Sequence, residues 1–206
     1  MDRKNLFPYL YKTSFNFDFS NSLRNKIDNF IEISRKITKE KNLETLEKNG
    51  GVTTALLNDP YFRGPHTWDE FTSLNMFLQD SVNEVLVEWG IDPYLQKQIE
   101  GSWVNVHPPG GYTDEHRHHG VLISCVFYLD VPEDSGNFLV RDPFEIYKLN
   151  LPVKNTYWDT ELWKSIEVKT NDLLLFPGWL QHKTEKNNSN SNRYVITWNV
   201  NPHYMV

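Results

Sequence analysis

The chain has 206 residues, of which 39% are hydrophobic and 14% aromatic, and its formal net charge at pH 7 is −6. This length favours one domain with a core of its own, and the aromatic content argues against a disordered chain. The acidic balance argues against general nucleic-acid binding, which needs a basic surface. Cys125 is the only cysteine, so an intrachain disulfide and a cysteine-rich zinc site are both excluded.

Targeting signals are missing from the sequence. Residues 1–8 lack the apolar core of a signal peptide, and no apolar run approaches the roughly 20 residues of a membrane helix. We therefore expect no contact with a membrane and a cytoplasmic location, in a cell or in a virus-infected host. An oligomer is compatible with the sequence.

The first half of the chain, residues 1–100, is predicted to contain one strand and then helices. Aromatic residues at odd-numbered positions between 6 and 19 alternate as on an edge strand with one buried face. Residues 21–41 change to a helical period, with Asn21 as the expected cap. Residues 67–70 (TWDE) have the capping-box pattern and predict a second amphipathic helix that ends near Gly90.

From residue 101 to 201 the pattern is that of short β-strands separated by turns rich in Pro, Gly, Asn and Asp. The expected strands are residues 101–107, 116–118, 121–129, 137–140, 165–168, 172–176 and 194–200. Many short strands without intervening helices predict a sandwich or a barrel. The predicted fold class is therefore α+β, with the helices on one outer face of a sheet and the mouth of the barrel free.

Two histidines, His116 and His118, follow a glycine turn at residues 110–111. Because they are two positions apart, they project from one face of an extended strand. A third imidazole, His182, follows an apolar strand and the sharp turn at residues 176–179 (FPGW). Such a facial set with open positions suits oxygen-activating non-heme iron, although imidazoles also bind zinc, nickel and copper. Alone, a His-x-His pair is more typical of a polar loop or of satisfied core histidines.

Asp114 competes with His118 for the third ligand position. It shares a strand face with His116, and two histidines with one carboxylate are the commoner iron set, so these residues alone leave the choice open. His119 would point to the opposite side of the strand and is expected at the surface or behind the ligands, and Glu115 is expected in solvent. The other histidines, expected to be structural or exposed, are His66, His107 and His203.

Arg193 opens the last predicted strand, eleven residues after His182. The simplest interpretation is that Arg193 is a surface arginine. An inward-facing guanidinium stays charged and must find an anion, so a dicarboxylate bound to the metal could pair with it in bidentate fashion. Period-two alternation places further polar side chains toward the same cavity: Tyr128, Asn105, Ser124, Thr197 and Asn199. Tyr128 and Asn105 are the strongest of these, because a phenol and an amide bind carboxylate oxygens.

Together these motifs resemble the 2-oxoglutarate/Fe(II)-dependent oxygenases found in phages and marine bacteria. The resemblance covers roughly residues 101–201. It rests on Trp103-Val104-Asn105, Gly111, His116-x-His118, Ser124-x3-Tyr128, Asp142-Pro143, Phe176-Pro177-x4-His182, Arg193 and Thr197-Trp198-Asn199. In that branch His-x-His stands where other oxygenases have His-x-Asp, so the resemblance favours His118 over Asp114. The family often has a hydroxyl residue two positions after the arginine, where this chain has Val195.

The resemblance implies a double-stranded β-helix (a jelly-roll barrel) within a single domain of residues 1–206. It implies Fe(II) held by His116, His118 and His182, with 2-oxoglutarate as cosubstrate and O2 as oxidant, and a hydroxylase reaction that needs no catalytic side chain beyond the metal ligands. Cosubstrate contacts are expected from Arg193, Tyr128, Asn105, Ser124 and Asn199.

Two other functions remain alternatives. A cupin-type three-histidine dioxygenase fits the same histidine spacing, but Leu122 and Ile123 occupy the region of its usual glutamate. A non-catalytic barrel that binds a metal or a sugar is the other alternative. The substrate, a protein side chain or a small molecule, cannot be read from the sequence. Residues 144–164, which include Trp158 and Trp163, form either a lid over it or an aromatic-pinned surface loop.

Overall fold

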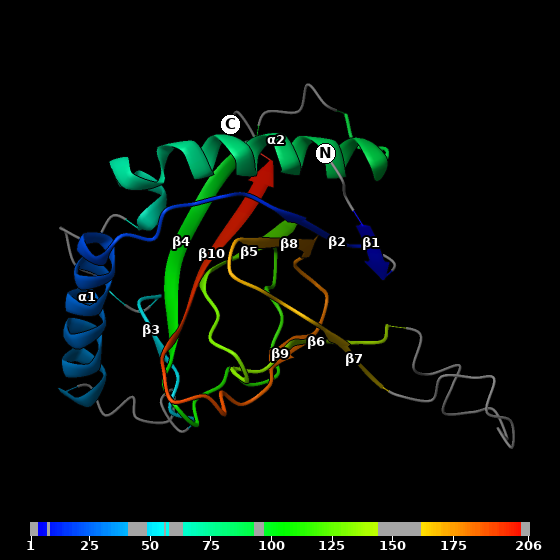
Figure 1. Ribbon diagram of the computed structural model, residues 1–206. Helices are drawn as coiled ribbons and strands as arrows, with labels where there is room; N and C mark the ends of the chain where they lie inside the picture. Colours follow the sequence, from blue (N-terminus) through cyan, green and yellow to red (C-terminus); the bar gives the residue numbers. More distant parts are fainter. Residues whose placement is uncertain are drawn as a thin grey trace, which may run out of the picture.

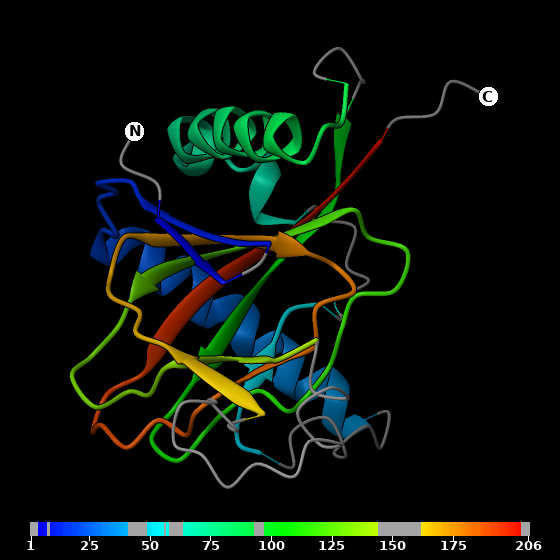
Figure 2. The ribbon, with the colours of Figure 1, turned by 90° about the vertical axis from the view of Figure 1, so that its right-hand side faces the viewer.

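The structure is a computed structural model that describes residues 4–7, 9–40, 49–55, 57, 64–92, 97–143 and 162–202. Within these residues, antiparallel strands form one sheet of seven and one of three. The smaller sheet lies across one face of the larger, as Figure 2 shows with β7 in yellow. The predicted mainly antiparallel β half is confirmed, as are the two helices.

The larger sheet has the order β1-β2-β8-β5-β10-β4-β3. Its strands are β1 (Lys4–Phe7), β2 (Leu10–Ser14), β3 (Val52–Thr53), β4 (Lys97–His107), β5 (Ile123–Asp130), β8 (Asp172–Pro177) and β10 (Arg193–Pro202). The smaller sheet has the order β7-β6-β9, and its strands are β6 (Phe138–Arg141), β7 (Trp163–Ile166) and β9 (His182–Thr184). β10 pairs with both β4 and β5 and so forms the middle of the wall that faces the smaller sheet.

The two faces of the larger sheet bury different partners. Helices α1 (Asn21–Glu40) and α2 (Thr72–Glu88) share one apolar cluster with the outer face (Figure 1), and short 3-10 turns at Pro65–Thr67 and Asp69–Phe71 lead into α2. The inner face shares a second cluster with β6 and β7, through Phe138, Val140 and Ile166. Alternation along each strand sends successive side chains to these two environments. The inner layer is therefore the place where polar side chains from both sheets can meet.

The predicted strand at residues 6–18 divides into two. β1 forms the sheet edge, Tyr9 with a φ of 73° makes the turn, and β2 pairs with β8. After β2 ends, the odd-numbered aromatic side chains still point toward the helices, so Phe15, Phe17 and Phe19 pack against the cluster between the helices and the outer face of the larger sheet. The pattern predicted the buried face correctly from Tyr11 onward, but Tyr9 is 45% exposed and hydrogen bonding in β2 stops at Ser14.

The expected helix starts need correction. The Leu23 amide donates to Ser20 Oγ at 3.3 Å, so Ser20 caps α1 and Asn21 is its first helical residue. The capping box is also wrong, because the Thr67 hydroxyl donates to the Gly64 carbonyl and α2 starts five residues later.

The end of α2 agrees with the prediction. Gly90 has a φ of 74°, and the amides of Gly90 and Ile91 donate to the carbonyls of Val87 and Leu86. This pair of bonds is a Schellman motif, which satisfies the last carbonyls of a helix.

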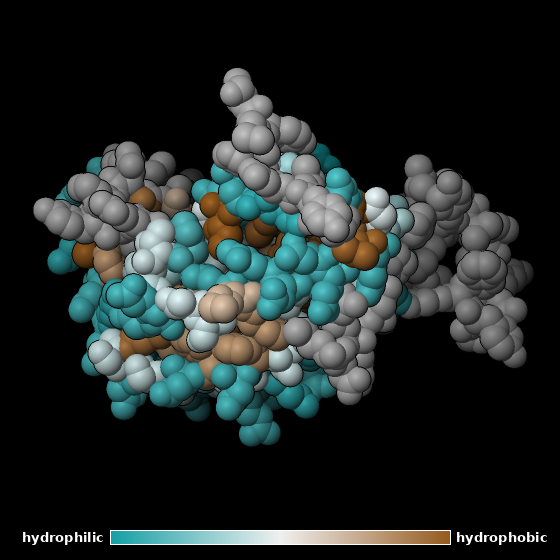
Figure 3. Space-filling view, turned by 90° about the horizontal axis from the view of Figure 1, so that it is seen from above, coloured by the Kyte–Doolittle hydropathy of each residue, from teal (hydrophilic) through white to brown (hydrophobic). Residues whose placement is uncertain are grey.

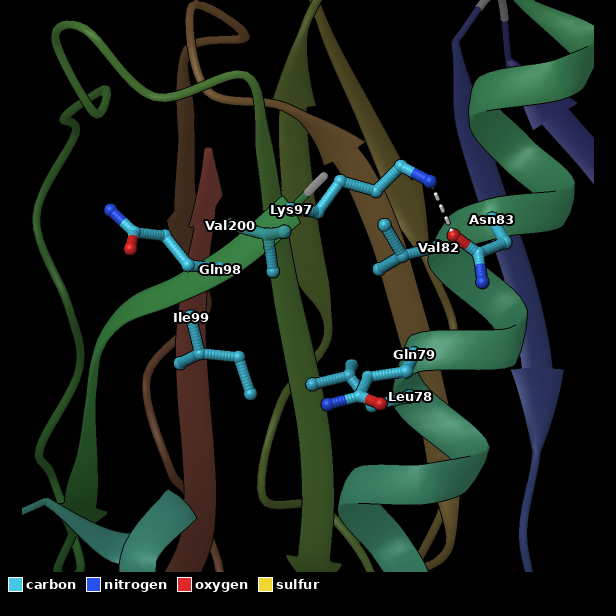
Figure 4. A pocket seen from close by; sticks show the side chains of 8 residues that line it. All are labelled: Leu78, Gln79, Val82, Asn83, Lys97, Gln98, Ile99 and Val200. Atoms are coloured by element: carbon cyan, nitrogen blue, oxygen red, sulfur yellow. Dashed lines mark hydrogen bonds between the residues drawn. The ribbon is translucent and has the colours of Figure 1, made fainter. Parts of the chain in front are cut away.

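A hollow of 160 Å³ lies between α2 and the strands β4 and β10 (Figure 4). Apolar side chains of Leu78, Val82, Ile99 and Val200 line it, and the Lys97 ammonium donates to Asn83 Oδ1 at 2.7 Å. It lies on the helix side of the larger sheet, away from the inner layer. Seen from above, this side of the molecule is mostly hydrophilic with smaller hydrophobic areas (Figure 3). In the part of the chain that the structure describes, no helix has the length and apolar character to cross a membrane.

The two candidate caps of α1 predict different stabilities for two neighbouring variants. Ser20→Ala removes the acceptor of the Leu23 amide and should lower the free energy of unfolding by about 1 kcal/mol. Asn21→Ala, at the first helical position, should change it by less than about half of that. Urea unfolding followed by circular dichroism measures both free energies. A larger loss of stability in Asn21→Ala than in Ser20→Ala would show that Asn21 is the cap, as the sequence predicted.

Candidate metal centre

Three histidines converge in the inner layer. The potential ligand atoms of His116, His118 and His182 all lie within 4.8 Å of one another. His116 and His182 form an isolated antiparallel bridge, in which each backbone amide donates to the carbonyl of the other at 3.0 Å. His182 opens β9, whereas His118 lies on an irregular segment, so the strand expected over residues 116–118 is reduced to the single bridge at His116.

Hydrogen bonds fix which nitrogen of two of these rings carries the proton. His116 Nδ1 lies 2.7 Å from the Asp114 carbonyl, and His182 Nδ1 lies 2.8 Å from the Leu180 carbonyl. A carbonyl oxygen only accepts, so each Nδ1 must be the N–H. The lone pair is then on Nε2, which is the form of imidazole that binds a metal. The Nδ1 of His118 instead meets side chains, with Asn199 Oδ1 at 2.8 Å and Ser124 Oγ at 2.6 Å.

The surroundings keep the three rings neutral. Burial lowers the pKa of all three, and that of His182 lies well below 6.5 because its two neighbouring imidazoles add to the effect of burial. Phe138 and Phe176 pack against the His182 ring, with centroid distances of 5.4 and 4.8 Å. Since the deprotonated ring is the ligand form, this donor set fits a divalent transition metal such as Fe(II).

The FPGW turn is required by the segment that carries His118. The His118 amide donates to the Gly178 carbonyl at 2.8 Å, so the two segments cross in contact. A Cβ on Gly178 would lie 2.5 Å from the Val121 carbonyl oxygen and 2.9 Å from that of His118. Only glycine therefore allows the turn after β8 to support the His118 segment.

The carboxylates near the histidines are engaged elsewhere. Asp114 is exposed, accepts a hydrogen bond from the Asn49 amide, and does not belong to the convergent group. Glu115 is exposed, as expected, and it also forms an ion pair with Arg141 at 2.7 Å. His119 is exposed at the surface, as expected, with Arg117 Nε 3.4 Å away.

A cavity of 70 Å³ adjoins the three histidines. Tyr128, Asn105 and Thr197 line it, in line with the period-two argument. Ser124 and Asn199, expected at the cosubstrate, do not line it and instead hold His118. The lining residues that the sequence argument did not select are His107, Thr113, Phe138 and Thr184, together with Trp103, Val126, Lys183 and Val195.

Arg193 is fully buried at the first position of β10, on the same face as Val195 and Thr197. Its Nη1 donates to the carbonyls of Ser135 and Gly136, and its Nη2 donates more weakly to that of Glu185. Within the described residues no carboxylate lies within 4.0 Å of the guanidinium, and the four hydrogen bonds recorded for it leave one of its five N–H groups over. Among the described residues the positive charge is therefore buried without a carboxylate in contact, and Arg193 itself does not line the cavity.

His107 connects this arginine to the cavity. Arg193 Nε lies 3.4 Å from His107 Nδ1, and His107 Nε2 lies 2.6 Å from Thr113 Oγ1. Since the guanidinium can only donate, Nδ1 accepts and Nε2 carries the proton, which the Thr113 hydroxyl accepts. His107 was expected to be structural or exposed, but it lies two positions after Asn105 on β4, and this alternation was the available signal for its position in the site.

Other predicted features lie partly outside the description. Trp158 and most of the candidate lid, residues 144–161, and also His203, are outside the described residues. Trp163 belongs to β7, where the Lys183 ammonium lies 4.0 Å from its ring centroid. His66 is half-buried, with its ring against Ser102 Oγ, which agrees with a structural role.

The contact at Gly178 predicts a strong effect of one methyl group. Gly178→Ala should displace the His118 segment, lower the free energy of unfolding by about 1–3 kcal/mol and weaken Ni²⁺ binding by about tenfold or more. Gly101→Ala is the matched control, because its Cβ would meet nothing within 4 Å. Calorimetric Ni²⁺ titration and urea unfolding measure both, and an unchanged Ni²⁺ affinity in Gly178→Ala would contradict the crossing geometry.

His107 predicts a pH dependence of stability. Burial, and then the Arg193 charge, lower the pKa of His107 well below 6.5. The unfolded chain therefore binds a proton as the pH falls below 6.5 while the folded chain does not, so this residue lowers stability toward acid by up to about 1.4 kcal/mol per pH unit.

His107→Gln should reduce the loss of stability toward acid. Urea unfolding of the metal-free protein at pH values from 6.5 downward measures this loss. His119→Gln, at an exposed ring, should follow the wild-type curve. Equal acid sensitivity of His107→Gln and the wild-type protein would show that His107 is not buried in its neutral form.

Comparison with known proteins gives a family match in the half that holds this site. The family model described as "Putative 2OG-Fe(II) oxygenase" matches residues 101–199. A comparison with curated protein sequences finds no match.

Among solved structures, a Pseudomonas putida prolyl-4-hydroxylase is similar with 11% identity and a TM-score of 0.50, over 95% of this chain and 93% of that one. An oxidoreductase of the 2OG-Fe(II) oxygenase family from Burkholderia pseudomallei has 12% identity and a TM-score of 0.47, over 65% of this chain and 58% of that one. HygX from Streptomyces hygroscopicus, solved with nickel and 2-oxoglutarate bound, has 12% identity and a TM-score of 0.41, over 80% and 86% of the two chains.

At such identities a structural likeness concerns the fold alone, and here the prolyl-4-hydroxylase carries it over nearly the whole length of both chains. This chain spans only 58% of the Burkholderia protein. The sequence match is the stronger finding, and it encloses all three histidines and Arg193. Residues 101–199 therefore match the model of the 2OG-Fe(II) oxygenase family, as the motifs within them predicted.

Proposed function

We propose that this protein is a 2-oxoglutarate- and Fe(II)-dependent dioxygenase, most simply a hydroxylase, which couples oxidative decarboxylation of 2-oxoglutarate to oxidation of a substrate C–H bond. The observation that carries this proposal is the convergence of three imidazoles within 4.8 Å inside the segment that matches the oxygenase family. We also propose that the two facing sheets form a double-stranded β-helix and that residues 1–206 act as one domain.

Nε2 of His116, His118 and His182 would hold the iron. Bound there with 2-oxoglutarate, Fe(II) would activate O2, which is the oxidant both for the decarboxylation and for the C–H bond, so no protein acid or base is needed. The chain's own task is to fix three neutral donors in one orientation. For two of these donors, His116 and His182, the orientation is fixed by hydrogen bonds from Nδ1 to backbone carbonyls.

A donor set without a carboxylate gives the cosubstrate a second role. Three neutral imidazoles leave the charge of a divalent ion uncompensated by the protein, while 2-oxoglutarate would bring negative charge to the metal. Opposite charges at contact distance in a partly buried site attract strongly. We therefore expect cosubstrate and metal to bind cooperatively.

Arg193 is the proposed partner of the far carboxylate of 2-oxoglutarate. Its buried charge has no carboxylate partner within the described residues, and a bidentate carboxylate is the strongest acceptor available to a guanidinium. Tyr128 and Asn105 line the cavity between Arg193 and the histidines. Burial raises the pKa of Tyr128, so its phenol stays protonated as a donor. Thr113 and Thr197 supply hydroxyl groups in a site where Val195 offers none.

A three-histidine dioxygenase that does not use 2-oxoglutarate is the second candidate. The observation in its favour is that Arg193 donates to backbone carbonyls and does not line the cavity. The two candidates differ in whether 2-oxoglutarate binds and is consumed. The substrate class, a protein side chain or a small molecule, is common to both.

Reconstitution with Fe(II) under anaerobic conditions, followed by 2-oxoglutarate and O2, tests the function. The wild-type protein should form succinate and CO2, and His182→Ala should abolish both. Arg193→Leu should raise the KM for 2-oxoglutarate by about 10-fold to 100-fold, the loss expected for charge-assisted hydrogen bonds. His119→Ala is the surface control and should behave as the wild type.

Two outcomes would overturn the proposal. O2 consumption that is independent of 2-oxoglutarate would favour the second candidate. Ni²⁺ binding without calorimetric binding of 2-oxoglutarate, and without O2 consumption, would favour a non-catalytic metal-binding barrel.

A further inference from the structure

His118 differs from the other two histidines in how it is held. His116 and His182 bind each other through two backbone hydrogen bonds, and the Nδ1 of each ring is fixed by a backbone carbonyl two residues away. His118 lies outside any strand, and no backbone carbonyl accepts from its ring. Its orientation therefore depends on side chains that come from other parts of the chain.

Two side chains meet at His118 Nδ1. Asn199 Oδ1 lies 2.8 Å from this nitrogen, and Ser124 Oγ lies 2.6 Å from it. Ser124 and Asn199 are directly paired in the register of β5 and β10, and the serine hydroxyl donates to Asn199 Oδ1 at 3.0 Å. Ser124 is fully buried, so this pair forms a fixed acceptor at the base of the imidazole.

The backbone of the same segment is also held by β10. Asn201, two positions after Asn199, donates from Nδ2 to the Gly120 carbonyl at 2.8 Å and accepts from the Leu122 amide at 2.6 Å. Asn199 therefore binds the His118 ring, and Asn201 binds the backbone that follows it.

The hydrogen-bond pattern selects one of two proton arrangements. With the proton on His118 Nδ1, the ring donates to Asn199 Oδ1, which also accepts from Ser124, and Nε2 has a free lone pair. With the proton on Nε2, Nδ1 would have to accept from Ser124, and Asn199 Oδ1 would lose both donors. An amide oxygen with two donors at 2.8 and 3.0 Å matches the first arrangement.

We propose that Asn199, supported by Ser124, is the positioning residue that sets the tautomer of His118 and so makes this imidazole the third metal ligand. The metal part of this inference rests on the proposed function, whereas the tautomer is a property of the metal-free chain. Partners that fix the second nitrogen of a metal-binding histidine typically change metal affinity by about 10-fold to 100-fold when they are removed.

The tautomer can be observed directly in the metal-free protein. Long-range ¹H–¹⁵N spectra of protein labelled with ¹⁵N-histidine distinguish a protonated Nδ1 from a protonated Nε2, and the His118→Gln variant assigns the signal. The wild-type protein should show His118 with the proton on Nδ1. A wild-type signal with the proton on Nε2 would overturn the proposal without any need for a second variant.

Three variants then connect the tautomer to binding of Ni²⁺, used as an air-stable probe. Asn199→Leu removes the acceptor and should weaken Ni²⁺ binding by about 10-fold to 100-fold, with a shift of the His118 signal toward protonated Nε2. Asn199→Asp keeps an oxygen acceptor and should retain the wild-type tautomer and at least the wild-type affinity. Ser124→Ala removes the support but keeps the Asn199 acceptor, so it should weaken Ni²⁺ binding less than Asn199→Leu does and leave the His118 tautomer unchanged.

The outcomes separate this inference from the proposed function. Unchanged Ni²⁺ affinity and an unchanged tautomer in Asn199→Leu would overturn the positioning role even if the protein is an active oxygenase. If Asn199→Leu is poorly folded, loss of the wild-type tautomer in the folded Asn199→Asp variant would overturn it equally. Failure to form succinate, with the predicted spectra and affinities present, would overturn only the proposed reaction.

Discussion

The rest of the site depends on one constraint: three imidazoles, one buried and two half-buried, must lie side by side in their neutral form with every Nε2 free. An isolated carboxylate in this environment would carry a charge out of water at a cost of several kcal/mol, whereas a neutral ring needs only a partner for its N–H. Each ring has that partner in an oxygen acceptor. The aromatic wall of Phe138 and Phe176 is compatible with His182 for the same reason, because an apolar surrounding favours the uncharged ring.

The two-layer arrangement explains how such a site is built. β10 lies between β4 and β5, with one face on the helix cluster and the other on the cavity. Its first residue, Arg193, carries the buried positive charge, and its seventh, Asn199, contacts the ring of His118. Because β10 is hydrogen-bonded on both sides, the distance between Arg193 and the histidines is set by a strand that cannot flex independently. A loop could not fix that spacing equally well.

The sequence predicted what depends on local pattern and missed what depends on distant partners. Alternation identified the inner face of β4, β5 and β10, which placed Tyr128, Asn105 and Thr197 in the cavity wall. It could not tell that Ser124 and Asn199 meet a histidine, because that contact requires the β5–β10 register and the path of an irregular segment. For Arg193 the alternation of the strand predicted which face carries the side chain. It could not predict the hydrogen bonds to the carbonyls of Ser135 and Gly136, which are more than fifty positions away in the chain. Ser20 and Asn21 both suit a cap, and packing of Leu23, Ile27 and Ile31 on the sheet decides between them.

The place occupied by His118 is matched to an imidazole and poorly matched to a carboxylate. An ionised aspartate has only acceptors, so at position 118 it would face the lone pairs of Asn199 Oδ1 and the crowded Ser124 hydroxyl. Asn199 would have to turn its amide to present Nδ2, which would leave Ser124 without the acceptor it has now. An aspartate side chain is also shorter than a histidine and could not both contact the β5–β10 pair and reach toward His116 and His182. A histidine at position 118 therefore depends on the Ser124–Asn199 pair. A change to the commoner carboxylate would also require changes on β5 and β10.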